Sequence, residues 1–228
     1  MDNLPYYIYL VFGLTLLLAI FLFYKATNYS KIFLTIISVW ITAQAIFSLS
    51  GFYKIVNTIP PRFALLLLPP LVMTIVLFNT KKGKQFIDNL KLNTLTLFHI
   101  IRVPVELVLF WLFVSKTVPE LMTFEGRNFD ILSGISASII FYYGFVKKTL
   151  NKNILLLWNF ISLALLFNIA FNAILSLPSA FQQFAFAQPN IAIIHFPFVL
   201  LPSILVPLVL FAHLASIRQL LNDKKHLI

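Results

Sequence analysis

Seven stretches of apolar residues, each near the length of a membrane-spanning helix, constrain the fold of this chain more than any other feature. They cover residues 6–24, 32–49, 63–78, 93–115, 129–146, 153–176 and 191–217. A helix needs about 20 apolar residues to cross the hydrocarbon core of a bilayer. The chain is 60% hydrophobic and 11% charged, whereas soluble domains are about 45–50% apolar. We therefore predict an all-α integral membrane protein in which residues 1–228 form one bundle of seven transmembrane helices.

Lysine and arginine residues gather at one set of helix ends, and this bias predicts the orientation. The larger set is Lys25, Lys31, Lys81, Lys82, Lys84, Lys91, Lys147, Lys148, Lys152, Arg218, Lys224 and Lys225. The opposite set is Lys54, Arg62, Lys116 and Arg127. Cytoplasmic loops carry an excess of these residues, so the bias of twelve to four predicts an N-terminus outside and a C-terminus in the cytoplasm. We expect a multi-pass protein of the cell membrane, specifically the inner membrane of a bacterium.

The net charge of +10 lies in short loops between apolar segments. We therefore assign it to topology and to anionic lipid rather than to nucleic acid. The chain has no cysteine, which excludes disulfides, thiolate catalysis and iron–sulfur clusters. Seven helices with the N-terminus outside is the rhodopsin layout, but the last apolar segment has no lysine for a retinal Schiff base. The expected partners are the lipid bilayer and a small molecule or ion, and the oligomeric state stays open.

Three polar residues of the fourth apolar segment, His99, Arg102 and Glu106, follow the spacing i, i+3, i+7. At about 100° per residue they share one helix face. Lipid cannot satisfy such a face, so we predict that it points into the bundle. It forms either a structural Arg102–Glu106 pair that holds helices together or the lining of a functional cavity. Pro104 lies between the two and predicts a kink, because proline leaves a backbone carbonyl without its donor.

Two histidines lie at similar predicted depth near the inner membrane surface. His99 is about six residues from the inner end of its segment, and His213 is about four residues from the inner end of the last one. We predict that they form an inner polar pair. The favoured interpretation is that they bond to backbone groups or lie at the membrane interface, and axial ligation of a haem is the least favoured.

A second group of polar residues is predicted at the outer surface, around the start of the fifth segment. We expect Glu125, Arg127 and Asp130 to converge with His195 and Glu106 around one outward-facing pocket. Carboxylates and histidine suit a divalent metal ion or acid–base chemistry. In the alternative interpretation the segment is a surface loop.

These residues receive candidate roles. The candidate catalytic residues are Glu106, Glu125, Asp130 and His195. The candidate ligand-binding residues are Arg102, Arg127 and Asn128. The metal candidates are Glu125, Asp130 and His195. Asn128 is also placed to cap the fifth helix, where its side chain would accept from the free amides of the first turn.

The sequence predicts a small membrane enzyme or a ligand- or metal-binding protein with an intramembrane polar site. A transporter or channel is the first alternative, with a path from the outer group past Arg102 and Glu106 to His99 and His213. A non-catalytic subunit of a membrane complex is the second. A polar lining from face to face would favour transport, a pocket with one mouth would favour an enzyme, and a large apolar patch outside the lipid belt would favour a subunit.

Overall fold

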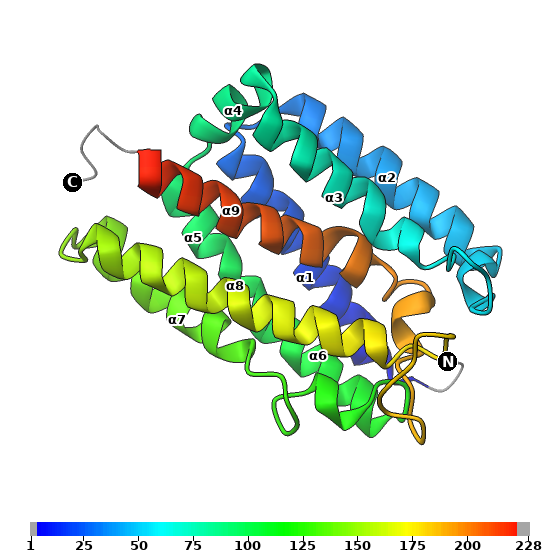
Figure 1. Cartoon of the computed structure of the whole chain (residues 1–228). Coiled ribbons are helices and arrows are strands. Elements are labelled where there is room, and N and C mark those ends of the chain that lie inside the picture. Colours follow the sequence, from blue (N-terminus) through cyan, green and yellow to red (C-terminus); the bar gives the residue numbers. More distant parts are fainter. Residues whose placement is uncertain (1–3, 223–228) are drawn as a thin grey trace.

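The computed structural model describes residues 4–222, and these residues form helices and no strands. Nine α-helices are described, together with short 3-10 and π segments (Figure 1). The α-helices are α1 (Tyr6–Ala26), α2 (Lys31–Leu49), α3 (Ala64–Asn79), α4 (Lys81–Asp88), α5 (Leu92–Phe98), α6 (Arg102–Val114), α7 (Ile131–Phe141), α8 (Lys152–Leu175) and α9 (Val206–Asn222). The 3-10 segments are η1 (Phe52–Lys54), η2 (His99–Ile101), η3 (Glu120–Met122) and η5 (Ala192–Ile194), and the π segments are η4 (Tyr142–Val146) and η6 (Leu201–Leu205).

Several of these helices are long and apolar enough to cross a membrane, which indicates a multi-pass membrane protein. Five meet this condition: α1, α2, the continuous run through α5 and α6, α8, and the run through η6 and α9. A sixth is added if α3 and α4 count as one bent span. The segment Ile131–Val146 is apolar but shorter. By length alone five or six spans are therefore supported, and seven stays a prediction.

The outer surface of the bundle is apolar, as expected for a lipid-facing surface. On α1, the exposed residues Leu10, Leu14, Leu17 and Phe21 follow helical spacing along one face. The opposite face carries Phe12 and other residues that are fully buried. A soluble monomer rarely exposes such a continuous apolar surface, so lipid is the solvent that fits it.

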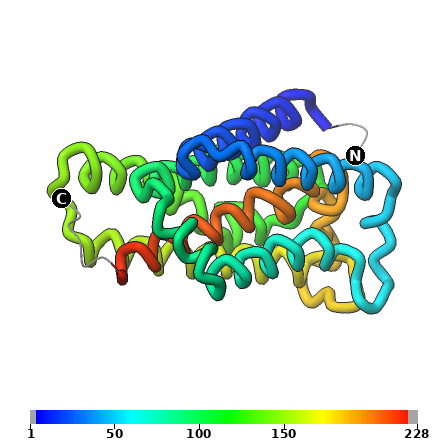
Figure 2. The backbone as a smooth tube through the Cα atoms, turned by 90° about the horizontal axis from the view of Figure 1, so that it is seen from above, coloured from blue at the N-terminus to red at the C-terminus, as the bar shows by residue number. Residues whose placement is uncertain are grey.

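α9 is the central helix of the bundle. It packs against α5 and α8, while α1 packs against α5 and α6. In Figure 1, α9 runs between α3 and α8. Figure 2, the view from above, places α1 along one face of the bundle and shows that α1 begins at the end opposite to the one where α9 finishes. Residues Lys224 and Lys225, assigned above to the cytoplasmic set, lie outside the described range.

The corner between α3 and α4 is sharp, and a glycine permits it. The two helices meet at 94°. A Cβ on Gly83 would lie 2.2 Å from the carbonyl oxygen of Leu77, so no other residue fits without a backbone shift. Thr80 caps α4, because its hydroxyl accepts from the amide of Gly83 at 3.2 Å. The exposed lysines of α4 therefore lie on a short helix across the end of α3.

The predicted helix over residues 191–217 is wrong, because this part of the chain is not one helix. It contains η5, an irregular segment with Pro197, and then η6 leading into α9. Pro197 has no amide to donate, and the backbone just before it, at His195, is extended rather than helical. Pro207 in the same way leaves the carbonyl of Ser203 without its usual donor. The indole of Trp40 on α2 supplies one at 2.9 Å, which attaches α2 to η6.

The predicted helix over residues 129–146 also needs correction. It begins at Ile131 and ends in the π segment η4. The chain before it folds back into the bundle, where Asn128 and Asp130 are buried. Gly126 allows this fold, because a Cβ there would lie 2.4 Å from the carbonyl oxygen of Glu120. Residues expected at the outer surface are thereby brought to the depth of Arg102.

Candidate functional site

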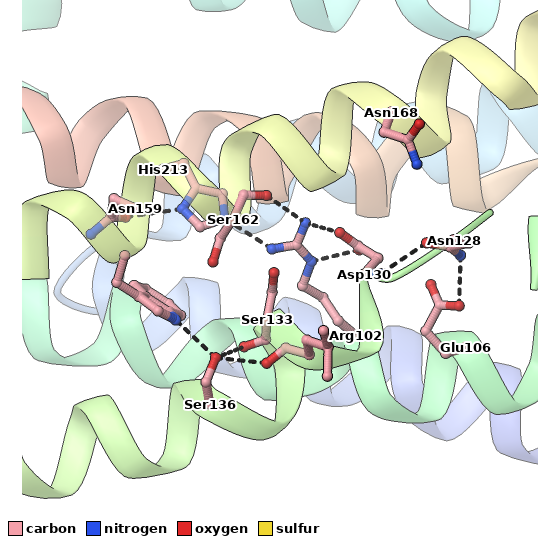
Figure 3. Close-up of polar contacts among 12 residues, drawn as sticks. Arg102, Glu106, Asn128, Asp130, Ser133, Ser136, Asn159, Ser162, Asn168 and His213 are labelled. Atoms are coloured by element: carbon pink, nitrogen blue, oxygen red, sulfur yellow. Dashed lines mark hydrogen bonds and ion pairs between the residues drawn. The ribbon is translucent and has the colours of Figure 1, made fainter. Parts of the chain in front are cut away.

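A buried ion pair between Arg102 and Asp130 forms the centre of the site (Figure 3). The guanidinium donates two hydrogen bonds to the carboxylate, one from each of Nε and Nη2. Nη2 also donates to the carbonyl oxygen of Ser162 on α8 at 3.0 Å. Arg102 is 2% exposed and Asp130 is 5% exposed. The prediction that Arg102 and Glu106 face the interior is confirmed, but the expected Arg102–Glu106 pair is replaced by Arg102–Asp130.

Close packing of α7 against the start of α6 makes the Arg102–Asp130 ion pair possible. Gly134 lies one helical turn after Asp130, and a Cβ on it would lie 2.8 Å from Val103 Cγ2 and 3.1 Å from Arg102 Cβ. A larger residue would push α7 away from the start of α6. Small residues at helix contacts in membranes allow backbones to approach closely. Here the approach brings the start of α7 to the level of the guanidinium.

His213 on α9 extends the network and has a defined tautomer. Its Nε2 lies 3.1 Å from Arg102 Nη1, and its Nδ1 lies 2.9 Å from Asn159 Oδ1. Arginine can only donate, so Nε2 accepts and the ring proton is on Nδ1, which donates to Asn159. The Asn159 amide is itself oriented by donation to the carbonyl oxygen of Leu155 at 2.9 Å. The imidazole is therefore held neutral between an arginine and an asparagine.

His99 stacks directly on His213, so the two predicted inner residues are in contact. The favoured interpretation is wrong, because both rings are fully buried and neither bonds to a backbone group in the described structure. The two ring centroids are 3.8 Å apart and the ring planes differ by 14°. Trp158 packs against both rings, at centroid distances of 5.5 Å and 5.7 Å. Both nitrogens of His99 are buried without a hydrogen-bond partner in the described structure. The pair is thus part of the arginine network through His213 alone.

Glu106 lies one helical turn after Arg102, closer to the end of the bundle where α6 finishes. Its Oε2 accepts from Asn128 Nδ2 at 2.6 Å, and the same amide group donates to the carbonyl oxygen of Met122 at 3.0 Å. Asn128 Oδ1 accepts from the backbone amide of Asp130 at 3.0 Å. Asn128 was expected to cap the fifth helix, but α7 starts after this turn, so its side chain holds the loop to Glu106 instead. No described residue donates a hydrogen bond to Glu106 Oε1.

A cavity of about 60 Å³ lies beside these residues, between α6, α8 and the η6–α9 run. Arg102, Glu106 and Asp130 form its polar side. The rest of the lining is apolar and includes Leu166, Ile169 and Leu205. A site for one water molecule needs only about 10–15 Å³ on this scale, so the cavity has room for a small polar group and a few carbon atoms.

The structure does not bring the remaining predicted site residues into this cluster. Glu125 is exposed, and the Arg127 guanidinium lies 5.8 Å from the centre of the Phe184 ring. His195 Nδ1 lies 2.8 Å from the carbonyl oxygen of Ile191. His195 lies in the irregular segment before η6 rather than on a helix that extends to His213, so the two do not share a helix face. The expected convergence of Glu125, Arg127 and His195 with Glu106 is therefore wrong.

The described residues contain no group of three or more histidine, cysteine, aspartate or glutamate side chains that could hold a metal ion. The proposed metal candidates Glu125, Asp130 and His195 are separated in the fold, because Asp130 is bound to Arg102 and Glu125 faces outward. Their roles in catalysis or metal binding stay predictions.

Sequence reasoning missed three participants on α8: Trp158, Asn159 and Ser162. Asn159 could have been found, because an asparagine in an apolar span usually faces a partner inside the bundle. Ser162 contributes its backbone carbonyl, and no side-chain pattern predicts that. Trp158 donates from Nε1 to Ser136 Oγ at 2.9 Å, so its indole is fixed against the histidines from the side of α7.

Comparisons of the chain with known protein families, with curated proteins and with solved structures find no match.

Proposed function

We propose that this chain is a membrane protein that binds a small ligand in the cavity beside Arg102, with Glu106 as the side chain that contacts it. The observation that carries the proposal is the free oxygen of Glu106. Glu106 lines a cavity that is otherwise mainly apolar, and no described residue donates to this oxygen. A carboxyl group inside a membrane is costly unless it is protonated or paired. A ligand with a hydrogen-bond donor, such as an amine or a hydroxyl, fits this position.

The neighbouring ion pair supports a positioning role for Arg102 rather than the anion-binding role expected from sequence. Four hydrogen bonds engage its guanidinium: two to Asp130, one to His213 and one to Ser162. Its charge is compensated by Asp130, so an anionic ligand would meet little uncompensated positive charge. Glu106 is then the group placed to exchange a proton with a bound ligand if the protein is an enzyme.

For the topology, we propose seven crossings with the N-terminus outside and the C-terminus in the cytoplasm of a bacterial cell. The α3 helix and the Ile131–Val146 segment would be the two shorter crossings. The lysine-rich connections 80–91 and 147–152 lie at the end of the bundle where α9 finishes, and the connections 115–130 and 177–191 lie at the other end (Figure 1). This separation of charge is the pattern expected of cytoplasmic and external loops.

Thermal unfolding of the purified protein with small water-soluble ligands tests the proposed site. Butylamine and butan-1-ol should stabilise the wild type, and butyrate should not. Binding at about 100 times the dissociation constant stabilises a protein by about 2.7 kcal/mol. Glu106→Gln keeps the size of the side chain and an acceptor for Asn128 but should lose the stabilisation by butylamine. Glu120→Gln, at an exposed glutamate, is the matched control. Equal stabilisation of both variants by butylamine would overturn the proposal.

Transport is the second candidate function, because one observation favours it. A continuous series of hydrogen bonds links Asn159, His213, Arg102, Asp130 and, through Asn128, Glu106. Arginine and asparagine do not take up and release protons, so in such a pathway Asp130 and Glu106 would carry the proton and the other residues would hold them in place. Reconstituted liposomes with an internal pH dye test this candidate. An imposed potassium diffusion potential should then drive proton entry in the wild type and not in Asp130→Asn.

A further inference from the structure

A second cavity of about 50 Å³ lies next to the first. The two share five lining residues: Ala170, Ala173, Ile193, Pro202 and Val206. The second cavity is completed by Phe63, just before α3, by Leu66 and Leu67 of α3, by Ile174 of α8 and by Leu177, which follows α8. Every one of these side chains is apolar. The polar groups are thus confined to one end of a pair of adjoining cavities, and the other end is made of hydrocarbon.

The second cavity lies between α3 and α8, on the side where α9 runs between those helices (Figure 1). Leu67 on α3, Ala170, Ala173 and Ile174 on α8, and Val206 at the start of α9 are only partly buried. These residues therefore connect the cavity lining with the outer surface of the bundle. Neighbouring exposed residues, such as Leu68 on α3 and Phe171 on α8, are apolar. The surface around this opening is suited to lipid rather than water.

We propose that the ligand is a single-chain amphiphile that enters from the bilayer between α3 and α8, with its chain in the second cavity and its donor head group at Glu106. This inference rests on the proposed function and adds the ligand class and the route. The apolar lining offers the chain no polar partner, and the free oxygen of Glu106 accepts from an amine or a hydroxyl. Ala173 lies where the two cavities adjoin, because it is one of the five residues that line both.

Native mass spectrometry of the protein in lipid nanodiscs tests this proposal with decylamine, decan-1-ol and decane as probes. The wild type should retain decylamine and decan-1-ol. Ala173→Phe fills the shared part of the cavities and should reduce retention of both by at least tenfold. Ala164→Phe, on the exposed face of the same helix, should bind as the wild type does. Because all variants are compared in the same lipid, partition of a probe into the bilayer is the same for each variant and does not affect the ratio of retained probe between variants. Val206→Phe narrows the cavities from the opposite wall and replaces Ala173→Phe if that variant does not fold.

Head-group recognition is read from the same measurement. Decylamine and decan-1-ol should be retained over decane by the wild type, and Glu106→Gln should remove most of the preference for the amine. Hexylamine should be retained less than decylamine, because its shorter chain makes fewer contacts with the apolar lining of the two cavities.

Equal retention of decylamine by the wild type and Ala173→Phe would overturn the route. If butylamine stabilises the wild type but not Glu106→Gln, while decylamine is not retained, the amphiphile proposal falls and the proposed ligand site stands. If decane and decylamine are retained equally by the wild type and Glu106→Gln, recognition at Glu106 is refuted, and both proposals fall.

Discussion

Replacing Arg102 with leucine should destabilise the protein by about 3–5 kcal/mol, the cost of leaving one partner of a buried ion pair without its counterion. The side chains of Arg102 and Asp130 are 3% and 7% exposed. In the Arg102→Leu variant, the Asp130 carboxylate loses both of its guanidinium hydrogen bonds. His213 Nε2 and the carbonyl oxygen of Ser162 lose their donors as well. Each buried group left without a partner adds to the cost.

The chain contains a matched control, because Arg218 and Asp88 form a second arginine–aspartate pair with two hydrogen bonds of 2.9 Å. Their side chains are 22% and 45% exposed. Exposed pairs of this kind contribute about 0–1 kcal/mol, so Arg218→Leu should have little effect. The two variants make the same chemical change and differ mainly in burial.

Titration with a denaturing detergent, followed by circular dichroism, gives the free energies of unfolding for these variants in mixed micelles. The double variant Arg102→Leu/Asp130→Leu should be more stable than Arg102→Leu alone, because it leaves no unpaired charge. The reasoning fails if Arg102→Leu costs no more than Arg218→Leu. It also fails if the second substitution recovers no stability, because the loss would then not arise from the unpaired carboxylate.

Three further predictions concern other parts of the chain. Gly134→Ala should destabilise the protein by about 1–3 kcal/mol through overpacking. Gly144→Ala should be nearly neutral, since the nearest atom to its added Cβ is 3.7 Å away. Equal free energies of unfolding for the two variants would contradict this. In intact cells, an impermeant maleimide should label Glu125→Cys and not Lys148→Cys, and the reverse pattern would invert the topology. Burial raises the pKa of Tyr53 to about 12 from an ordinary value of 10.0, so stability should fall as pH rises through that interval, and Tyr53→Phe should weaken the fall.

The helices were predictable because apolar length alone determines where a span can form. The predicted segment 32–49 corresponds to Lys31–Leu49, and 63–78 corresponds to Ala64–Asn79. The segment 191–217 failed because its helix was expected to begin at residue 191, whereas the helical run begins at Leu201, after Pro197. Its apolar character was read correctly, but hydropathy does not distinguish a helix from a buried irregular segment that is held by tertiary hydrogen bonds.

For the candidate site, the residues that share one helix face could be predicted, but most contacts between different helices could not. The spacing of Arg102 and Glu106 showed that both face inward, and depth counted along the chain placed His99 near His213. Asp130 was assigned to the outer surface because its segment was assumed to cross the whole membrane. Its real depth depends on a loop that folds back into the bundle through Gly126, and such a path depends on contacts far apart in sequence.

The position of Asp130 also matters while the chain is being synthesised and inserted into the membrane. Arg102 is separated from Asp130 by 28 residues and from His213 by 111 residues. An arginine at the centre of an inserting helix costs about 2.5–3.5 kcal/mol. A chain made from its N-terminus supplies the countercharge of Arg102 with the very next apolar segment, long before the last helix emerges. The charge can therefore be neutralised while α8 and α9 have still to enter the membrane, and His213 joins a pair that is already assembled.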